Sequence, residues 1–170
     1  MDLATRHDAA SREDLERRLA DLGIETRTVE HPPVFTVEEA KALRGEIAGG
    51  HCKNLFLKDK KGEVWLVVCL EKAEVDLKRL PLKIGAARLS FGRPELLMDL
   101  LGVEPGSVTP FALINDAGQR VNVVLDAEML RHEVLNYHPL VNSATMSIRA
   151  ADLMTFIRAC GHQPSLLDLR

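Results

Sequence analysis

The sequence predicts an α+β (mixed α/β) fold, with a curled, mainly antiparallel β-sheet and helices at its periphery. Apolar stretches of strand length dominate the middle of the chain, most clearly residues 64–70, and most of them connect through hairpin turn signals. Amphipathic helical patterns lie outside this region, at 12–22 and 150–160. The chain has 170 residues, of which 46% are hydrophobic, and this suits one domain over residues 1–170 with a buried core.

An N-terminal helix and strand form an extension over residues 1–30. Ser11 is the expected N-cap of a helix over residues 12–22, whose leucines share one face, and Gly23 ends it. Residues 24–30 then alternate like a strand, and the sequence HPP at 31–33 breaks it. The order of these signals predicts a helix, a strand and a turn.

The next elements are a short helix and a hairpin. Thr36 and Glu39 form a T-x-x-E capping box for the helix. Strands are expected at about 53–58 and 63–70, because DKKG between them is a hairpin turn signal.

The C-terminal half continues this alternation. Pro94 suits the first turn of a helix that Gly102 ends. A second hairpin is predicted around Asn115–Gly118, joining PGSVTPFALIND to QRVNVVLD, and a further strand pair in HEVLNYHP and SATMSIR. AADLMTFIRACG is a terminal amphipathic helix with Gly161 as its stop.

Charge is unevenly distributed along the chain. The net charge is −3 and the sequence pI about 6.1, so no global basic field points to nucleic acid. Residues 53–93 nevertheless carry a local balance of +5, against −8 for the remainder. Such a region can contact a phosphate backbone, although a solvated face is the commoner reason for such a run.

The cysteines and the N-terminus indicate the compartment. Three widely spaced cysteines and no C-x-x-C fit a reducing cytosol. The polar N-terminus does not resemble a signal peptide, and no apolar run approaches the ~20 residues that span a bilayer. We therefore expect a soluble cytoplasmic protein without a membrane partner.

Three segments are candidates for chemistry. In GGHCKN, Gly49–Asn54, two glycines permit close backbone approach and Lys53 suits a phosphate, but a loop before an edge strand gives the same pattern. In Pro105–Pro110, a pre-shaped G-x-x-x-P loop could offer amides to an anion or oxyanion, yet loops are often rich in Gly and Pro. In Asn136–Thr145, His138 lies among small polar side chains that suit a pocket wall, or is a half-exposed structural histidine.

Other chemistry has little support in the sequence. His31 before two prolines reads as a turn. No H-x-x-x-H or paired C-x-x-C is present, so neither a metal site nor another cofactor is expected. A Cys52 nucleophile with a distant His138 base stays open, although a cysteine at an apolar strand start is usually a core residue.

Several motifs in order resemble the YbaK/prolyl-tRNA synthetase-associated editing family, and within it the freestanding alanyl-tRNA(Pro) deacylases. These are EHPPVFTVEEA, GGHCKNLFL, ARLSFGRPELL, LGVEPGSVTPFALIND, VVLDAEML and NYHPLVNSATMSI, which extend from about Glu30 to the C-terminal helix. The resemblance implies an aminoacyl-tRNA deacylase that hydrolyses the ester of mischarged Ala-tRNA(Pro) in trans. It also implies the family's compact mixed fold with a curled sheet.

The resemblance also implies the site residues. The family's essential lysine corresponds to Lys53, with Asn54 beside it, and both are expected to be catalytic. The family's G-x-x-x-P loop corresponds to Gly106, Ser107, Val108, Thr109 and Pro110, which with His138 would bind the substrate. Members specialised for cysteine usually carry small or hydroxyl residues before the lysine, whereas this chain has His51 and Cys52, which favours alanine.

The implied partner is the acceptor end of tRNA(Pro), with prolyl-tRNA synthetase or an elongation factor as further candidates and no DNA. An editing site of this kind is needed because a synthetase pocket rejects a substrate lacking one methylene by only ~1–3 kcal/mol. Alternatives are a deacylase for Cys-tRNA(Pro) or another aminoacyl-tRNA, and a non-catalytic module that binds tRNA or a synthetase.

Overall fold

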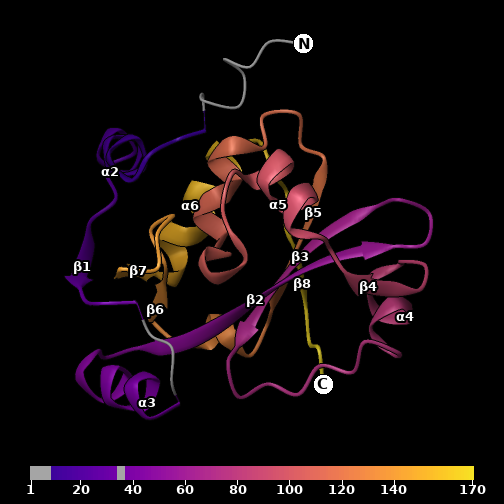
Figure 1. The fold of residues 1–170 in the computed structure, drawn as a ribbon, viewed down its shortest axis with the longest axis horizontal. Coiled ribbons are helices and arrows are strands. Elements are labelled where there is room, and N and C mark those ends of the chain that lie inside the picture. The colour runs from indigo at the N-terminus through magenta and orange to yellow at the C-terminus, as the bar shows by residue number, and fades with distance from the viewer. Residues whose placement is uncertain (1–8, 34–36) are drawn as a thin grey trace.

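The computed structural model describes residues 9–33 and 37–170, which form one mixed sheet with helices around it (Figure 1). The strand order is β1-β7-β6-β2-β3-β5-β8, and β4 also pairs with β2. Four pairings are antiparallel (β1–β7, β6–β7, β2–β3 and β2–β4) and three are parallel (β2–β6, β3–β5 and β5–β8). The strands are β1 Thr26–Glu30, β2 Gly50–Asp59, β3 Val64–Leu70, β4 Leu89–Phe91, β5 Val121–Asp126, β6 Val134–Tyr137, β7 Ala144–Arg149 and β8 Ser165–Leu167.

The helices are short and mostly capped by the residues that the sequence suggests. Ser11 forms a capping box with Asp14, and Gly102 ends its helix in the left-handed conformation. The helices are α2 Arg12–Asp21, α3 Val37–Glu46, α4 Leu80–Ile84, α5 Pro94–Leu101 and α6 Ala150–Ala159, with 3-10 turns η1 Pro105–Ser107, η2 Pro110–Asn115 and η3 Met129–Arg131.

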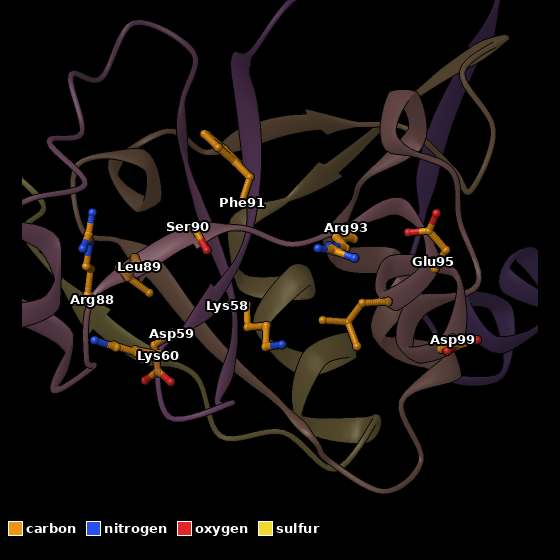
Figure 2. Close-up of a pocket in the computed structure, with 11 residues that line it drawn as sticks. Lys58, Asp59, Lys60, Arg88, Leu89, Ser90, Phe91, Arg93, Glu95 and Asp99 are labelled. Carbon is orange, nitrogen blue, oxygen red and sulfur yellow. The ribbon is translucent and has the colours of Figure 1, made fainter.

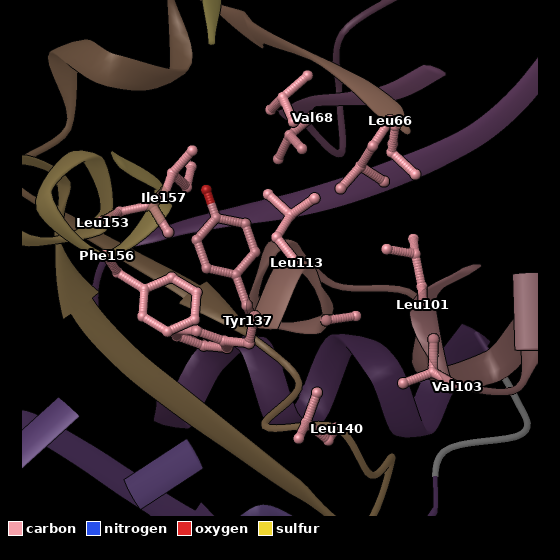
Figure 3. Packing of buried hydrophobic residues seen from close by; sticks show 14 of the residues in the cluster. Leu66, Val68, Leu101, Val103, Leu113, Tyr137, Leu140, Leu153, Phe156 and Ile157 are labelled. Atoms are coloured by element: carbon pink, nitrogen blue, oxygen red, sulfur yellow. The ribbon is translucent and has the colours of Figure 1, made fainter. Parts of the chain in front are cut away.

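Strands β2 and β3 separate two hydrophobic clusters, because side chains alternate between the faces of a strand. The larger cluster holds one set of alternate side chains, among them Phe56, Leu66 and Val68, and packs against α5, η2 and α6. Figure 3 shows part of it, where the Tyr137 ring lies among apolar side chains of α6 and η2. The smaller cluster holds the other set, including Leu57 and Val67, under α4 and the C-terminus. The central strands are therefore buried on both faces.

The structure confirms the fold class and most predicted elements, including the β2–β3 hairpin and the β6–β7 strand pair. The second hairpin is wrong. PGSVTPFALIND contains two 3-10 turns instead of a strand, since Thr109 caps η2 and Pro110 begins it, and β5 pairs in parallel with β3. Elements α4, β4 and β8 were not predicted from the sequence. Thr36 of the predicted capping box lies outside the described residues.

No helix among residues 9–33 and 37–170 combines the length and the apolar character that a membrane span needs.

Candidate functional site

The first candidate segment begins where β2 enters the sheet, at two glycines that the chain's own packing requires. Gly49 has a φ of +105°, and a Cβ there would lie 2.9 Å from the carbonyl oxygen of Val134. A Cβ on Gly50 would lie 3.0 Å from the ring of His132. The close backbone approach predicted for this pair is therefore made to the β6 region of the same chain.

Asn136 holds this junction in place. Its Nδ2 donates to the carbonyl oxygens of Ala48 (3.0 Å) and Gly50 (3.2 Å), and its Oδ1 accepts from the hydroxyl of Ser147. All of its side-chain polar atoms are thus committed inside the protein, which fits its 4% exposure. Asn136 belongs to the polar candidate segment 136–145, but no local pattern in the sequence indicates this role.

Lys53 lies in β2 and His138 directly follows β6, near the point where these two strands stop pairing. These strands run parallel, and Gly50 pairs with Leu135 and His51 with Asn136. Cys52 and Tyr137, the next residues along the two strands, are in side-chain contact. The β2–β6 pairing thus brings the two candidate segments to neighbouring strands, although Lys53 and His138 are 85 positions apart in the sequence.

The Lys53 ammonium is fixed at the end of the smaller hydrophobic cluster. Lys53 is half-buried and shares a face of the hairpin with Cys69, its partner in β3. Its Nζ donates to the carbonyl oxygen of Ala73, 2.5 Å away, just beyond the end of β3. An ammonium has three donors, so this contact positions the charge and leaves donor capacity for a ligand.

Two cavities flank the segment that holds the ammonium. One, of about 410 Å³, lies beside Gly49, Gly50 and His51. The other, of about 550 Å³, is lined by Ala73 itself and by acidic and basic side chains. Leu70 and Lys72 line both cavities. Ala73, which anchors Lys53, thus belongs to the segment that separates the two cavities.

Asn54 points to the opposite face of β2. It pairs with Val68, whose side chain belongs to the larger cluster. Its Oδ1 is buried and has no hydrogen-bond partner among the described residues. A buried acceptor of this kind costs free energy unless a water or a ligand donates to it.

Cys52 is a poor nucleophile in this setting. Burial raises the pKa of its thiol to about 12, although contacts with Tyr137 and the backbone of Asn136 act in the other direction. Near neutral pH the group is a thiol rather than the reactive thiolate.

The G-x-x-x-P loop is ordered by its own hydrogen bonds. The Ser107 N–H donates to the Glu104 carbonyl oxygen (2.8 Å), and the Thr109 hydroxyl accepts from the Phe111 N–H (3.3 Å). Ser107, Thr109 and Pro110 are buried, Val108 is half-buried and Gly106 is exposed. Because the Ser107 amide is committed, an oxyanion donor from this loop has to be another of its amides.

The loop approaches the segment that carries His138. A Cβ on Gly106 would lie 3.5 Å from Nδ2 of Asn142, four residues beyond His138. His138 Nδ1 lies 3.1 Å from the carbonyl oxygen of Ala144, and since a carbonyl only accepts, Nδ1 carries the hydrogen. Burial holds the pKa of His138 below its usual value, although the contact with Ala144 opposes this. The neutral ring therefore keeps a lone pair on Nε2.

His31 belongs to the same neighbourhood and has a structural part in it. Its Nε2 lies 2.9 Å from the Thr145 hydroxyl, and its backbone N–H donates to Ser143 (2.9 Å). These bonds join the end of β1 to β7, which fits the predicted turn.

The segment thus offers a fixed ammonium on one face of β2, an unpartnered amide oxygen on its other face, and a neutral imidazole just beyond the end of β6. Such a set can position an anionic ligand and a water beside it, the chemistry of a hydrolase that acts by positioning and electrostatics. No three His, Cys, Asp or Glu side chains lie close enough to hold a metal ion within the described ranges.

Comparisons with known proteins assign the family. Residues 31–156 match the family described as "Aminoacyl-tRNA editing domain". The chain is 42% identical over 165 residues to the prolyl-tRNA synthetase associated domain-containing protein 1 of Bos taurus, covering 94% of this chain and 96% of that protein. It is 36% identical over 153 residues to the prolyl-tRNA editing protein ProX of Acetoanaerobium sticklandii, covering 89% and 93%.

A solved structure shares the fold. A protein described as "a putative trans-editing enzyme for prolyl tRNA synthetase" superposes with a TM-score of 0.69 at 22% identity, covering all of this chain and 98% of its own. The family and the fold are thus those of an aminoacyl-tRNA deacylase. The chain belongs to the aminoacyl-tRNA editing domain family, as the resemblance in its motifs implied, and is a trans-editing domain of the prolyl-tRNA synthetase-associated kind.

Proposed function

We propose that this protein deacylates Ala-tRNA(Pro) in trans. The observation that carries the proposal is the Lys53 ammonium, which the Ala73 carbonyl oxygen anchors while donors remain for a ligand. Lys53 and His138 fall inside the matched family region, as do Asn54 and the Gly106–Pro110 loop. The relatives' names associate their domains with prolyl-tRNA synthetase and with prolyl-tRNA editing.

In the proposed mechanism each of these groups binds a different part of the aminoacylated terminal adenosine. Lys53 holds the phosphate or sugar of the terminal adenosine, for which a compact ammonium suits. The Gly106–Pro110 loop bounds the aminoacyl group and offers an amide to the ester oxygen. His138 lies beside the aminoacyl group, where its Nε2 lone pair accepts a hydrogen bond from the attacking water or from the amino group.

The hydrolysis itself needs only water as the co-reactant. The water oxygen bonds to the ester carbonyl carbon, and the bond from that carbon to the ribose oxygen breaks. The neighbouring hydroxyl of the terminal ribose assists, and the proton lost by water ends on the ribose oxygen. The products are free alanine and uncharged tRNA(Pro).

Selection for alanine follows from size. The cognate product, Pro-tRNA(Pro), has to be spared, and both side chains are apolar, so polar recognition separates them poorly. Proline adds the bulk of its ring and ties back its own amine. Overfilling a packed site costs ~1–3 kcal/mol, which corresponds to about 5- to 150-fold in rate at ~1.4 kcal/mol per factor of ten.

The test is a deacylation panel with Ala-, Cys-, Ser- and Pro-tRNA(Pro), with the Lys53→Met and Lys61→Met variants beside the wild type. Lys61 is an exposed lysine in the β2–β3 turn and serves as the matched control. We expect rapid loss of alanine, slow loss of proline, and a defect in Lys53→Met alone. Faster cleavage of the cysteinyl or seryl ester would assign a different substrate, and binding without cleavage would indicate a non-catalytic module.

A further inference from the structure

Another hollow lies at the other end of β2. It measures about 810 Å³ and is formed by the end of β2, by β4 and by the first turns of α5 (Figure 2). Lys58, Lys60, Arg88 and Arg93 line it, together with the exposed ring of Phe91. The mechanism proposed above uses none of these residues.

The four basic side chains are available to a ligand. Each belongs to an exposed residue, and none forms an ion pair with a described residue. In Figure 2, Arg88 and Lys60 lie on one side of the hollow and Arg93 on the other, with Lys58 between them. They form a row of cations along the hollow.

The acidic residues of the hollow do not cancel this row. Asp59 is 4% exposed, and its carboxylate accepts from three backbone N–H groups, those of Lys61, Glu63 and Ala87. Its charge is thus used within the hairpin. Glu95 and Asp99 lie together on α5 (Figure 2), so the exposed rim keeps an excess of two positive charges and its negative part is confined to one side.

Phe91 presents an aromatic ring beside the cations. It is 63% exposed, although its backbone is fixed in β4 and pairs with Leu57 of β2. The next residue, Gly92, passes directly against Phe56, since a Cβ there would lie 2.4 Å from the Phe56 ring. The Gly92 N–H also donates to the Phe56 carbonyl oxygen. A ring held outward on a fixed strand is preorganised for contact.

We propose that this hollow is an RNA-docking surface that receives the acceptor stem of the tRNA, an assignment that rests on the proposed function. The cations contact backbone phosphates, and Phe91 stacks on an exposed base or on the terminal base pair. Cations interleaved with an aromatic ring are the combination by which proteins hold nucleic acid without reading its sequence.

The spacing along β2 fits this use. Five positions separate Lys53 from Lys58, about 17 Å at ~3.3 Å per strand residue. Because five is an odd number, the two side chains point to opposite faces of β2, so the unpaired 3′ end rather than the duplex would pass from the hollow to Lys53. Strand β2 would then contact the duplex at its C-terminal end and the terminal nucleotide at its N-terminal end.

The test measures binding without hydrolysis, so it is independent of the ester that the enzyme cleaves. A fluorescent, uncharged acceptor-stem minihelix ending in CCA is titrated at several salt concentrations. Lys58→Ala and Arg93→Ala are each expected to weaken binding and to lower the slope of log Kd against log salt by about one. Phe91→Leu is expected to weaken binding by about 5- to 100-fold, and Phe91→Trp to restore it.

Two further variants separate this role from a structural one. Asp99→Asn removes a negative charge from the α5 side of the hollow and should tighten binding, an outcome that misfolding does not produce. Arg158→Gln removes an exposed cation from α6 and should change nothing. With charged tRNA, the docking variants should raise KM and leave kcat near the wild-type value.

Unaltered minihelix binding and salt slope in Lys58→Ala and Arg93→Ala would overturn the proposal, even if Ala-tRNA(Pro) is hydrolysed as expected. Displacement of the minihelix by polyglutamate as readily as by unlabelled RNA would also overturn it, because the hollow would then fit an acidic protein segment. Conversely, a protein that binds the minihelix through this hollow but spares Ala-tRNA(Pro) would contradict only the proposed function.

Discussion

Replacing Lys53 by Met should remove catalysis with little change in stability. Methionine keeps the apolar stem of the side chain beside Cys69 and deletes only the ammonium. The lost hydrogen bond is the one to the Ala73 carbonyl oxygen. Bonds of charged groups contribute about 1.5–3 kcal/mol, and because Lys53 is half-buried, solvent reduces this to about 1 kcal/mol.

The effect on the reaction should be much larger. Removing a single preorganised donor from a site of developing charge typically lowers the rate by ~10²–10³. A domain with 5–15 kcal/mol of stability stays folded after losing about 1 kcal/mol, so the two effects can be measured separately.

The assay follows first-order loss of alanine from Ala-tRNA(Pro) with excess enzyme, beside urea unfolding of the same protein. Lys61→Met is the control, and its rate and unfolding midpoint should match those of the wild type. A folded Lys53→Met protein with the wild-type rate would remove Lys53 from the mechanism.

Three further predictions concern other groups. Cys52→Ser should retain deacylation, because the buried thiol, with its pKa raised to about 12, is not the nucleophile; a trapped thioester in the wild type would contradict this. EDTA should leave the rate unchanged, whereas loss of activity that zinc restores would refute the metal-free mechanism. Burial holds the pKa of His138 below its ordinary 6.5, so a rate that needs the neutral ring should persist through pH 6.5 and fall only below it. His138→Gln should abolish this acid limb after subtraction of uncatalysed hydrolysis, and a limb that persists would assign it to another group.

The sequence predicted the elements that local rules determine. Ser11 at one helix, and Pro94 and Gly102 at another, are local capping signals, and the structure has the helices there. The apolar run at 64–70 similarly becomes β3. Strands β4 and β8 have three residues each, too short for a period to be seen, and tertiary pairing determines them.

The second hairpin was wrong for a related reason. The apolar residues 111–114 resemble a strand in composition, but Pro110 lacks an N–H and the Thr109 hydroxyl accepts from Phe111, which favours a turn of helix. Only the packing of this 3-10 turn against the larger cluster decides between the two.

The candidate site likewise depends on contacts between distant segments, which local sequence patterns do not predict. The motifs identified Lys53, Asn54 and His138, but nothing local indicates that β2 pairs in parallel with β6, or that Asn136 holds the Gly49–Gly50 turn. Ala73 contributes only a carbonyl oxygen, a group that every residue carries. Sequence patterns can therefore name reactive side chains, whereas the backbone groups that orient them depend on the fold.

Strand β2 explains why the site tolerates a flexible lysine. It pairs with β3 over seven residues, with β6 at its start and with β4 at its end, so neighbouring strands hold it at both ends. Its backbone cannot shift without breaking pairings on both sides, and the ammonium is fixed at its far end by Ala73. Ordering a free lysine side chain costs ~2 kcal/mol of rotamer entropy. Here most of that entropy is lost when the protein folds, rather than when the substrate binds. Because this entropy is lost before the substrate binds, the binding free energy of tRNA remains available to orient the ester.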